Sequence, residues 1–329
     1  MADGMHGGVD REVGMGGMGG MGGPEAETMT SGESLFAWTV FPLVMSICVG
    51  LCLALIERGV SLTVAMPAPM LLGYVLVILG ERLYPYVPDW NRSHGDLATD
   101  AAWWLSINVT GLSFRPLTVL VAAPLGAWLS ARFGAALWPS DWSLIAQLGL
   151  ALVIVEFFQY WAHRWMHEVD FLWRFHATHH SAPRLYWLNA ARFHVVDIAL
   201  LNVGLIIPLI ALGADARVIA LWLVVSTVHG LFQHSNMMIR CGPLNWIFSM
   251  AELHRWHHSR TIREANTNYG SNLILWDIVF GSRFLPKDRR PPADIGIANL
   301  SAFPMTWWQQ LISPFFWSAI KRKSASGGS

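Results

Sequence analysis

Charged residues are scarce in this sequence. Asp, Glu, Lys and Arg make up 13% of the 329 residues, whereas hydrophobic residues make up 53% and the mean hydropathy is positive. This composition is typical of a polytopic membrane protein and argues against a soluble globular enzyme. The net charge is zero, and no basic run is longer than residues 321–323. We therefore expect no nucleic-acid partner.

Cysteine is also rare. The three cysteines are Cys48, Cys52 and Cys241, and no two of them form a CxxC pair. Cys48 and Cys52 lie at helical spacing in an apolar stretch, where cysteine usually behaves as a small hydrophobic residue. We expect neither disulfide bonds nor a metal site built on thiolates.

Long apolar stretches predict membrane-spanning helices. The first of them covers about 30 Å of hydrocarbon at about 1.5 Å per helical residue. The six predicted spans are 35–56, 62–79, 116–130, 144–161, 195–212 and 218–232. The sequence therefore predicts an all-α, polytopic membrane protein.

The spans divide the chain into four parts. Residues 1–34 are rich in Gly and Met and have few bulky apolar side chains, which predicts a disordered tail. We expect N-terminal transmembrane helices in 35–143, a histidine-rich unit in 144–285 and a C-terminal segment in 286–329.

The positive charges predict the orientation of the spans. If consecutive spans pair as hairpins, the links at one end carry Arg58, Arg132 and Arg217. All other Lys and Arg lie in the tail, after Leu79, in the histidine segments or in the C-terminal region. The positive-inside rule then places the N-terminus, the histidine clusters and the C-terminal segment on the cytoplasmic side of an integral membrane protein.

Histidine is what the chain has in abundance, in three clusters. These are HRWMH at 163–167, HATHH at 176–180 and HRWHH at 254–258. On a helix, residues three or four apart share a face, whereas adjacent residues diverge by about 100°, so neighbouring histidines can serve different metals. Neutral imidazole binds iron, zinc, copper and nickel. The pattern predicts two metal ions, with candidate ligands His163, His167, His176, His179, His180, His229, His234, His254, His257 and His258.

Four further candidate residues lie outside the three clusters. His229 and His234 lie about 140° apart on a regular helix, so both can be ligands only if the helix ends or unwinds near Gly230. His194 is a possible further ligand. Glu156 shares a helical stripe with His163, and it either orients a metal-binding ring as a hydrogen-bond partner or joins two helices.

At these residues the chain resembles the fatty acid hydroxylase and sterol desaturase superfamily of integral membrane oxygenases, which includes bacterial sterol desaturase-like proteins and alkylglycerol monooxygenases. The resemblance covers roughly 150–285 and rests on the ordered histidine clusters, with Asn-Tyr-Gly at 268–270 and Trp-Asp-Ile-Val-Phe-Gly at 276–281 behind them. The HxxxH first cluster and the Trp-Asp ending fit this superfamily better than the acyl-CoA desaturases. Residues 144–285 would then be the catalytic domain.

The resemblance implies a membrane-bound, non-haem di-iron centre. Such a centre uses O2 to hydroxylate or desaturate a C–H bond of a lipid of the sterol, alkylglycerol or fatty acyl type, and zinc could replace iron. Carried over by position, the ten candidate histidines named above would be the ligands. The electrons would come from a separate donor of the ferredoxin or cytochrome b5 type with a reductase. Aromatic residues near the clusters, among them Phe157, Trp161 and Trp187, could line an apolar tunnel, or they pack between helices or anchor the chain at the membrane interface.

Two interpretations without catalysis are a metal transporter and an inactive zinc-binding scaffold. A metal transporter usually carries polar residues through several spans, and the predicted spans here are nearly free of them. A catalytically inactive scaffold that keeps zinc for stability stays open, because imidazole ligation alone does not distinguish zinc from iron.

Overall fold

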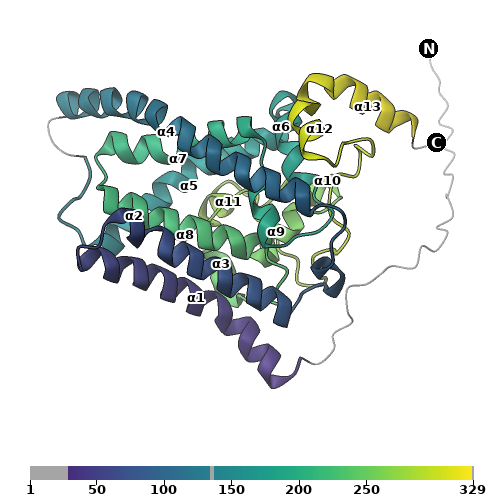
Figure 1. Cartoon of the computed structure of the whole chain (residues 1–329), viewed down its shortest axis with the longest axis horizontal. Coiled ribbons are helices and arrows are strands. Elements are labelled where there is room, and N and C mark those ends of the chain that lie inside the picture. Colours follow the sequence, from purple (N-terminus) through teal and green to yellow (C-terminus); the bar gives the residue numbers. More distant parts are fainter. Residues whose placement is uncertain (1–28, 134–136, 328–329) are drawn as a thin grey trace, which may run out of the picture.

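The predicted all-α architecture is confirmed. The computed structural model describes residues 29–133 and 137–327, and the Gly/Met-rich part of the predicted tail lies outside the described residues. Long helices run side by side, and short helices gather at one end of them (Figure 1). No β-strand is present among the described residues, where only isolated bridges occur.

The six predicted membrane spans are also confirmed, because six helical segments of the described residues are long and apolar enough to cross a membrane. Their bounds extend or match the predicted ranges. They are α1 (Ser31–Glu57), α2 with α3 (Leu62–Ala65 and Pro67–Leu83), the second half of α4 (Leu97–Phe133), α5 (Leu144–Glu168), α7 (Val195–Leu212) and α8 (Ala216–His234).

Helix α1 begins four residues before the predicted span. The side chain of Thr30 accepts a hydrogen bond from the amide of Glu33 at 3.3 Å, and the Glu33 carboxylate accepts one from the amide of Thr30 at 2.8 Å. This reciprocal capping satisfies two amides at the helix start. The end of the predicted disordered tail is therefore ordered.

Helix α4 is far longer than the predicted span at 116–130. It has 37 residues and continues through Pro116 and Pro124. Proline is tolerated in membrane helices, where neighbouring groups can satisfy the backbone that it leaves unpaired. The N-terminal half of α4 is held by the C-terminal region, because the Trp103 indole donates a hydrogen bond to the Gln310 side chain at 2.7 Å. This half brings Ile107 beside the histidine clusters.

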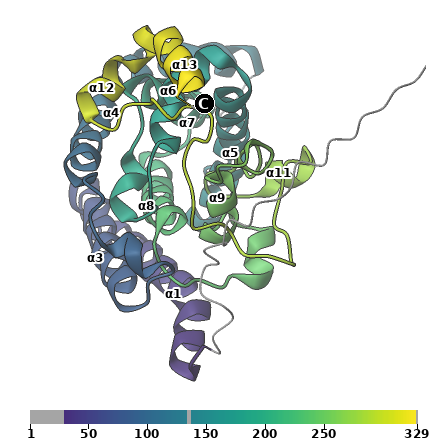
Figure 2. The same ribbon diagram turned by 90° about the vertical axis from the view of Figure 1, so that its right-hand side faces the viewer.

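Helix α8 lies in the middle of the bundle, as the end-on view shows (Figure 2). It packs against α1, α3 and α5, and buried residues along it, such as Leu221 and Val228, belong to the main hydrophobic core. Large apolar side chains on the outer helices, such as Leu71 and Leu120, are exposed. This exposure fits helices that face lipid.

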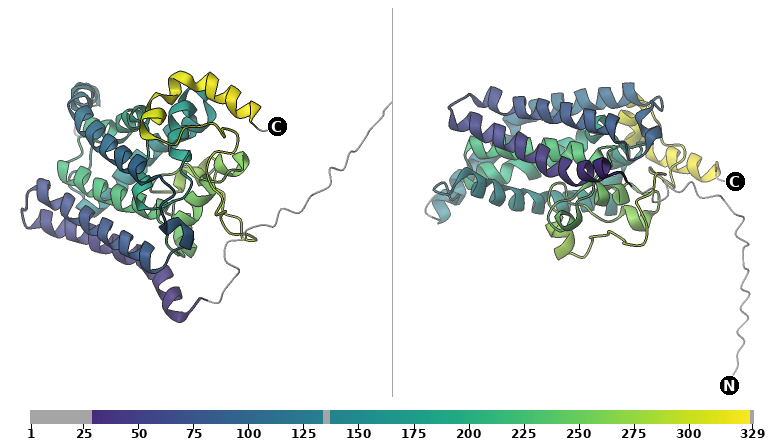
Figure 3. Two further views of the ribbon diagram at one scale, coloured as in Figure 1. Left: turned by 45° about the vertical axis from the view of Figure 1, so that its right-hand side comes forward. Right: turned by 90° about the horizontal axis from the view of Figure 1, so that it is seen from below.

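The short helices cover the end of the bundle where α5 and α8 stop (Figure 3). The C-terminal helices lie at this same end and pack against α4 and α6. The short elements are η1 (Pro88–Asn91), α6 (Asp170–His180), η2 (Trp187–Ala191), η3 (Gly242–Trp246), α9 (Ala251–His257), α10 (Ile262–Ala265), α11 (Leu275–Val279), α12 (Trp307–Ile312), η4 (Ser313–Phe316) and α13 (Trp317–Ser326). The end of the bundle thereby becomes a cap that holds most of the histidines.

Candidate metal centre

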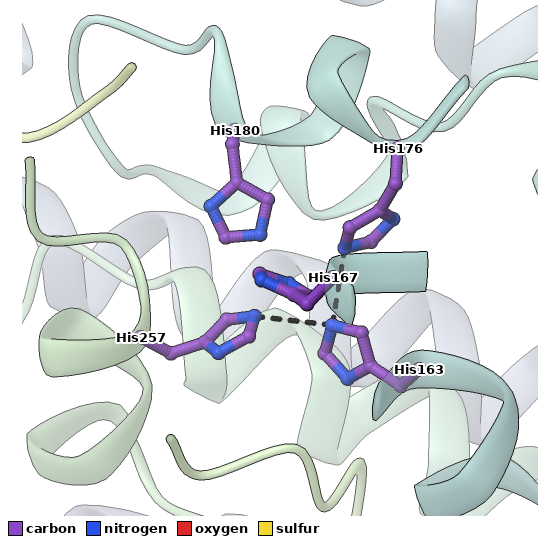
Figure 4. A group of neighbouring side chains, drawn as sticks. All are labelled: His163, His167, His176, His180 and His257. Carbon is purple, nitrogen blue, oxygen red and sulfur yellow. Dashed lines mark hydrogen bonds between the residues drawn. The ribbon is translucent and has the colours of Figure 1, made fainter. Parts of the chain in front are cut away.

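Nine histidines converge in two neighbouring groups at the junction of bundle and cap. In each group, one ring nitrogen from every member lies within 4.8 Å of those of the others. The five-histidine site consists of His163, His167, His176, His180 and His257, whose rings point toward one another in Figure 4. The four-histidine site consists of His179, His234, His254 and His258.

Helical geometry explains this division. On α6, His176 and His180 are four residues apart and enter the five-histidine site, whereas His179 turns toward the other site. On α9 the pattern is reversed, because His254 and the C-cap residue His258 share the four-histidine site while His257 turns away. Residues four apart share a helix face and adjacent residues do not. Two short helices therefore supply ligands to both sites.

The ring nitrogens approach one another closely. In the five-histidine site, Nε2 of His163 lies 3.1 Å from Nε2 of His176 and 3.0 Å from Nε2 of His257 (Figure 4). In the four-histidine site, Nε2 of His254 lies 2.9 Å from Nε2 of His234 and 3.1 Å from Nε2 of His258. Such spacings fit nitrogens that share one metal ion, since Zn–N bonds of about 2.0–2.1 Å place two ligands at similar separations.

The tautomers show that these contacts need a cation. Nδ1 of His163 lies 2.7 Å from the carbonyl of Tyr269, and Nδ1 of His257 lies 2.7 Å from the carbonyl of Thr267. A carbonyl only accepts, so each neutral ring carries its proton on Nδ1 and has a lone pair on Nε2. Two lone pairs then face each other at 3.0 Å. A metal ion between them removes this repulsion, so the residues fit a bound metal.

The four-histidine site is oriented in the same way. Asn189 donates its amide N–H to the carbonyl of Arg184, so its Oδ1 accepts from Nδ1 of His234 at 3.0 Å. Nδ1 of His179 donates to the carbonyl of Arg192 at 3.3 Å. Both rings therefore present an Nε2 lone pair. A hydrogen bond on the far nitrogen that fixes tautomer and ring direction is the usual arrangement around metal-bound histidine.

Burial keeps the cap histidines in the form that binds metal. Desolvation, with further repulsion from neighbouring imidazoles, holds the pKa values of His176, His179, His180, His254, His257 and His258 well below the ordinary value of 6.5. Their rings are neutral near pH 7, and a neutral imidazole does not have to lose a proton before it coordinates a metal.

A single loop orients three rings of the five-histidine site. We call residues 266–272 the orienting loop. Besides the carbonyls of Thr267 and Tyr269, it supplies the Asn266 side chain, whose oxygen lies 3.2 Å from Nδ1 of His167. Asn268 adopts a positive φ of 54°, and a Cβ on Gly270 would meet the carbonyl oxygen of Leu273 at 2.3 Å. This explains the Asn-Tyr-Gly sequence in the loop.

Two buried carboxylates clamp the orienting loop. Asp277 on α11 accepts hydrogen bonds from the amides of Tyr269 and Gly270 at 2.8 and 2.7 Å. Glu156 on α5 accepts from the amides of Ser271 and Asn272 at 3.0 and 2.8 Å. Glu156 therefore lies outside both histidine groups and positions the loop, which in turn positions a ring. The sequence pointed to Glu156 through its stripe with His163, whereas Asp277 stood out only as part of the Trp-Asp ending and not for a role at the histidines.

Replacing Asp277 by alanine should weaken metal binding at the five-histidine site selectively. The change leaves two amides of the orienting loop without their acceptor, so the carbonyl that fixes His163 moves. Loss of such a supporting hydrogen bond typically weakens metal affinity by about 10–100-fold. Metal titration of the purified protein should show one weakened site and one unchanged site, because Asn189 and Arg192 support the other group.

The matched control is Asp294→Ala. The Asp294 side chain is 80% exposed and pairs with Arg260 on the surface. This variant should bind metal as the parent protein does. Equal weakening of both sites in Asp277→Ala would contradict independent support of the two sites.

Two sequence-based candidates do not join either group. Helix α8 runs without a break from Ala216 to His234, so the condition for using both of its histidines is not met. His229 points away from His234 and packs its ring edge to face against Phe41. His194 caps α7 instead, with Nδ1 accepting from the amide of Val196 and Nε2 donating to the carbonyl of Leu311. Both of its nitrogens are thus occupied.

An apolar cavity of about 300 Å³ adjoins both histidine sites. We call it the inner chamber. It is lined by His163, His176, His179, His234 and His254, by apolar side chains of α4 and α7, and by a few polar residues. A polar cavity of about 240 Å³ reaches His167 and His180 from the cap.

Phe157, Trp161 and Trp187 do not line the inner chamber, and helix packing is the alternative that the structure favours for them. Phe157 and Trp161 instead pack against Trp276 and Phe280, and Trp187 packs against Tyr74. The apolar lining comes from residues such as Ile107, Phe193, Ile198, Leu201 and Leu205. These residues lie on α4, on α7 and, for Phe193, just before α7, which the histidine pattern does not mark.

Comparison with known proteins gives a consistent result. The fatty acid hydroxylase family model matches residues 148–282. The ornithine lipid hydroxylase OlsE of Rhizobium tropici is 41% identical over 249 residues, which are 73% of this chain and 72% of the relative. Alkylglycerol monooxygenase is 30% identical in Xenopus tropicalis, over 52% of this chain and 37% of the relative, and 32% identical in Homo sapiens, over 44% and 31%. No solved structure matches the chain.

Proposed function

The chain belongs to the fatty acid hydroxylase family and is an oxidoreductase that acts on lipid, and from this premise we propose that it is a membrane-bound di-iron oxygenase. In the reaction, one oxygen atom of O2 enters a C–H bond of a lipid and the other leaves as water. Two electrons and two protons are consumed. Hydroxylation is favoured over desaturation because the relatives are named as a hydroxylase and monooxygenases.

The observation that carries this proposal is the pair of adjoining sites built from imidazole alone. A structural zinc site is almost always four-coordinate, and five histidines exceed that number. Iron accepts more ligands and keeps positions for O2. Two iron ions held there would supply the activation of O2 and the removal of a hydrogen atom from carbon. A zinc scaffold would not need an apolar chamber at the ligands.

The residues around the sites perform the remaining tasks. The nine histidines hold the ions, and the orienting loop, Asn189 and the backbone of Arg192 fix the rings. The inner chamber excludes water and receives a lipid from the bilayer, since its apolar lining lies on membrane helices α4 and α7. The polar cavity at His167 and His180 gives small polar reactants a separate approach.

We further propose that the cap faces the cytoplasm, since Arg58, Arg132 and Arg217 lie at or near the opposite ends of their spans. A ferredoxin or cytochrome b5 type donor, with its reductase, would deliver the electrons from that side. Residues 144–285, together with the first half of α4, form the catalytic unit in this proposal.

The test is metal content combined with Mössbauer spectra of detergent-purified protein expressed with iron-57. We expect about two coupled irons per chain, consistent with two adjoining sites that use different ligands. Oxygen from labelled O2 should then appear in a hydroxylated lipid when the protein is supplied with lipid extract and reduced ferredoxin. Zinc alone, retained after iron-replete expression and without oxygen consumption, would support the scaffold reading instead.

A further inference from the structure

A second apolar cavity, of about 520 Å³, lies between α4, α7 and α8. We call it the outer chamber. Aliphatic side chains dominate its lining, among them Leu112, Val119, Ile206, Ile210, Ile219 and Leu223. No histidine belongs to this lining. The metal sites therefore do not account for the cavity.

The two chambers meet at one turn of α4. Ile107 and Gly111 line both of them. A Cβ built on Gly111 would meet no described atom within 4 Å, so the space beside this glycine is open. A larger side chain at position 111 would therefore add bulk at the turn of α4 that borders both chambers.

The outer chamber extends away from the metals along the membrane spans. Its lining includes Ala216, the first residue of α8, whereas the last residue of α8 is the candidate ligand His234. A helix of 19 residues is about 28 Å long, close to the thickness of the hydrocarbon core. Taken together, the two chambers extend from the cap deep into the spanning region.

Polar groups without partners lie only at the metal end among the described lining residues. The side-chain oxygens of Gln159 and Asn272 are buried without a hydrogen-bond partner among the described residues, and both side chains line the inner chamber. The amide nitrogen of Asn272 donates to Glu156 and Ser226, which leaves its oxygen as the free acceptor. A buried acceptor without a partner is costly, and a donor on a ligand removes that cost.

We infer that one lipid occupies both chambers, with its alkyl chain passing Gly111 into the outer chamber and a hydrogen-bond donor of its polar end at Gln159 and Asn272. This inference rests on the proposed function for the identity of the reacting lipid. The lipid that binds here must carry an amide N–H or a hydroxyl group close to the carbon that is oxidised. Oxidation then occurs near the polar end, and the terminal methyl group lies far from the metals.

Photolabelling tests the outer chamber without depending on turnover. The probes are palmitoyl ethanolamide and octanoyl ethanolamide, each with a diazirine at the end of the chain. In the parent protein, the palmitoyl probe should label α7 and α8 around Ile210 and Ile219, whereas the octanoyl probe should label inner-chamber residues. Gly111→Phe should lower outer-chamber labelling by the palmitoyl probe by about tenfold or more and leave the octanoyl probe bound.

Two further variants make the result specific. Gly149→Phe places the same bulk on the exposed side of α5, where a Cβ also meets no described atom within 4 Å, and it should label as the parent does. Val119→Trp fills the outer chamber from its far part, and it should shift palmitoyl labelling toward Gly111 even if Gly111→Phe does not fold. Equal labelling of all lipid-facing helices, unchanged in folded Gly111→Phe or Val119→Trp, would overturn the inference.

The polar end has its own readout. Gln159→Met keeps the size of the side chain but removes the acceptor. It should abolish the preference for palmitoyl ethanolamide over methyl palmitate, which has no donor, in competition with the photolabel. An unchanged preference would overturn this part of the inference.

Failure of this inference and failure of the proposed function give different results. The expected photolabelling could occur in a protein that contains only zinc and oxidises no lipid. That result would contradict the oxygenase proposal but not the lipid site. A folded Gly111→Phe that hydroxylates long and short chains as the parent does would remove the outer chamber alone.

Discussion

Replacing His257 by alanine should abolish lipid hydroxylation and remove about one of two bound metal ions. The expected reason is that each ion is held by the imidazoles of its own site. The His257 ring is fully buried, and its Nε2 lies 3.0 Å from Nε2 of His163 in the five-histidine site. Its Nδ1 lies 2.7 Å from the carbonyl of Thr267, so the ring is held with Nε2 toward the site. Metal analysis and product assays on purified protein measure both effects.

Membrane insertion should be unaffected by this change. His257 is the last residue of the short helix α9 in the cap, outside all six candidate spans. His94→Ala is the control, because His94 lies on the surface and pairs with Asp89. Full activity in His257→Ala would show that the ligand assignment is incorrect. Loss of both metals would show that the two sites do not bind independently.

The sequence predicted those parts of the molecule that depend on local pattern. Hydropathy located all six spans, and the range of α7 was predicted to the residue. Helical spacing within 176–180 and 254–258 was sufficient to expect that neighbouring histidines diverge. The ring directions follow from rotation along a single helix, and distant residues do not alter this rotation.

The parts that the sequence missed depend on contacts between distant residues. The orienting loop reaches His163 across 106 positions of the chain, and Asp277 contacts that loop rather than a histidine. The extra part of α4 contacts distant residues, because Asp100 pairs with Arg192 and Trp103 is hydrogen-bonded to Gln310. The two histidines of α8 could not be separated until the helix was known to continue through Gly230. Periodicity contains none of this information.

Replacing Asp100 by alanine should strongly destabilise the protein. Asp100 on α4 accepts hydrogen bonds from Nη1 of Arg192 at 2.8 Å and from the hydroxyl of Tyr186 at 2.8 Å. The side chains of Asp100 and Arg192 are both 0% exposed. Removal of one member of a buried ion pair leaves an unpaired charge, which typically costs about 3–5 kcal/mol. Denaturant unfolding in detergent should show this loss, whereas Asp89→Ala, which breaks an exposed pair with Arg92, should change little.

The same variant should also disturb one metal site more than the other. The carbonyl of Arg192 orients His179, so movement of Arg192 weakens the four-histidine site first. The double variant Asp100→Leu with Arg192→Leu removes both charges, and it should recover part of the lost stability because an apolar pair needs no desolvation of charge. The rest stays lost because the Tyr186 hydroxyl still lacks its acceptor. Metal affinity would recover only if the backbone of Arg192 returns to its place. If Asp100→Ala is as stable as the parent protein, this buried ion pair does not hold α4 in place beside the metal centre.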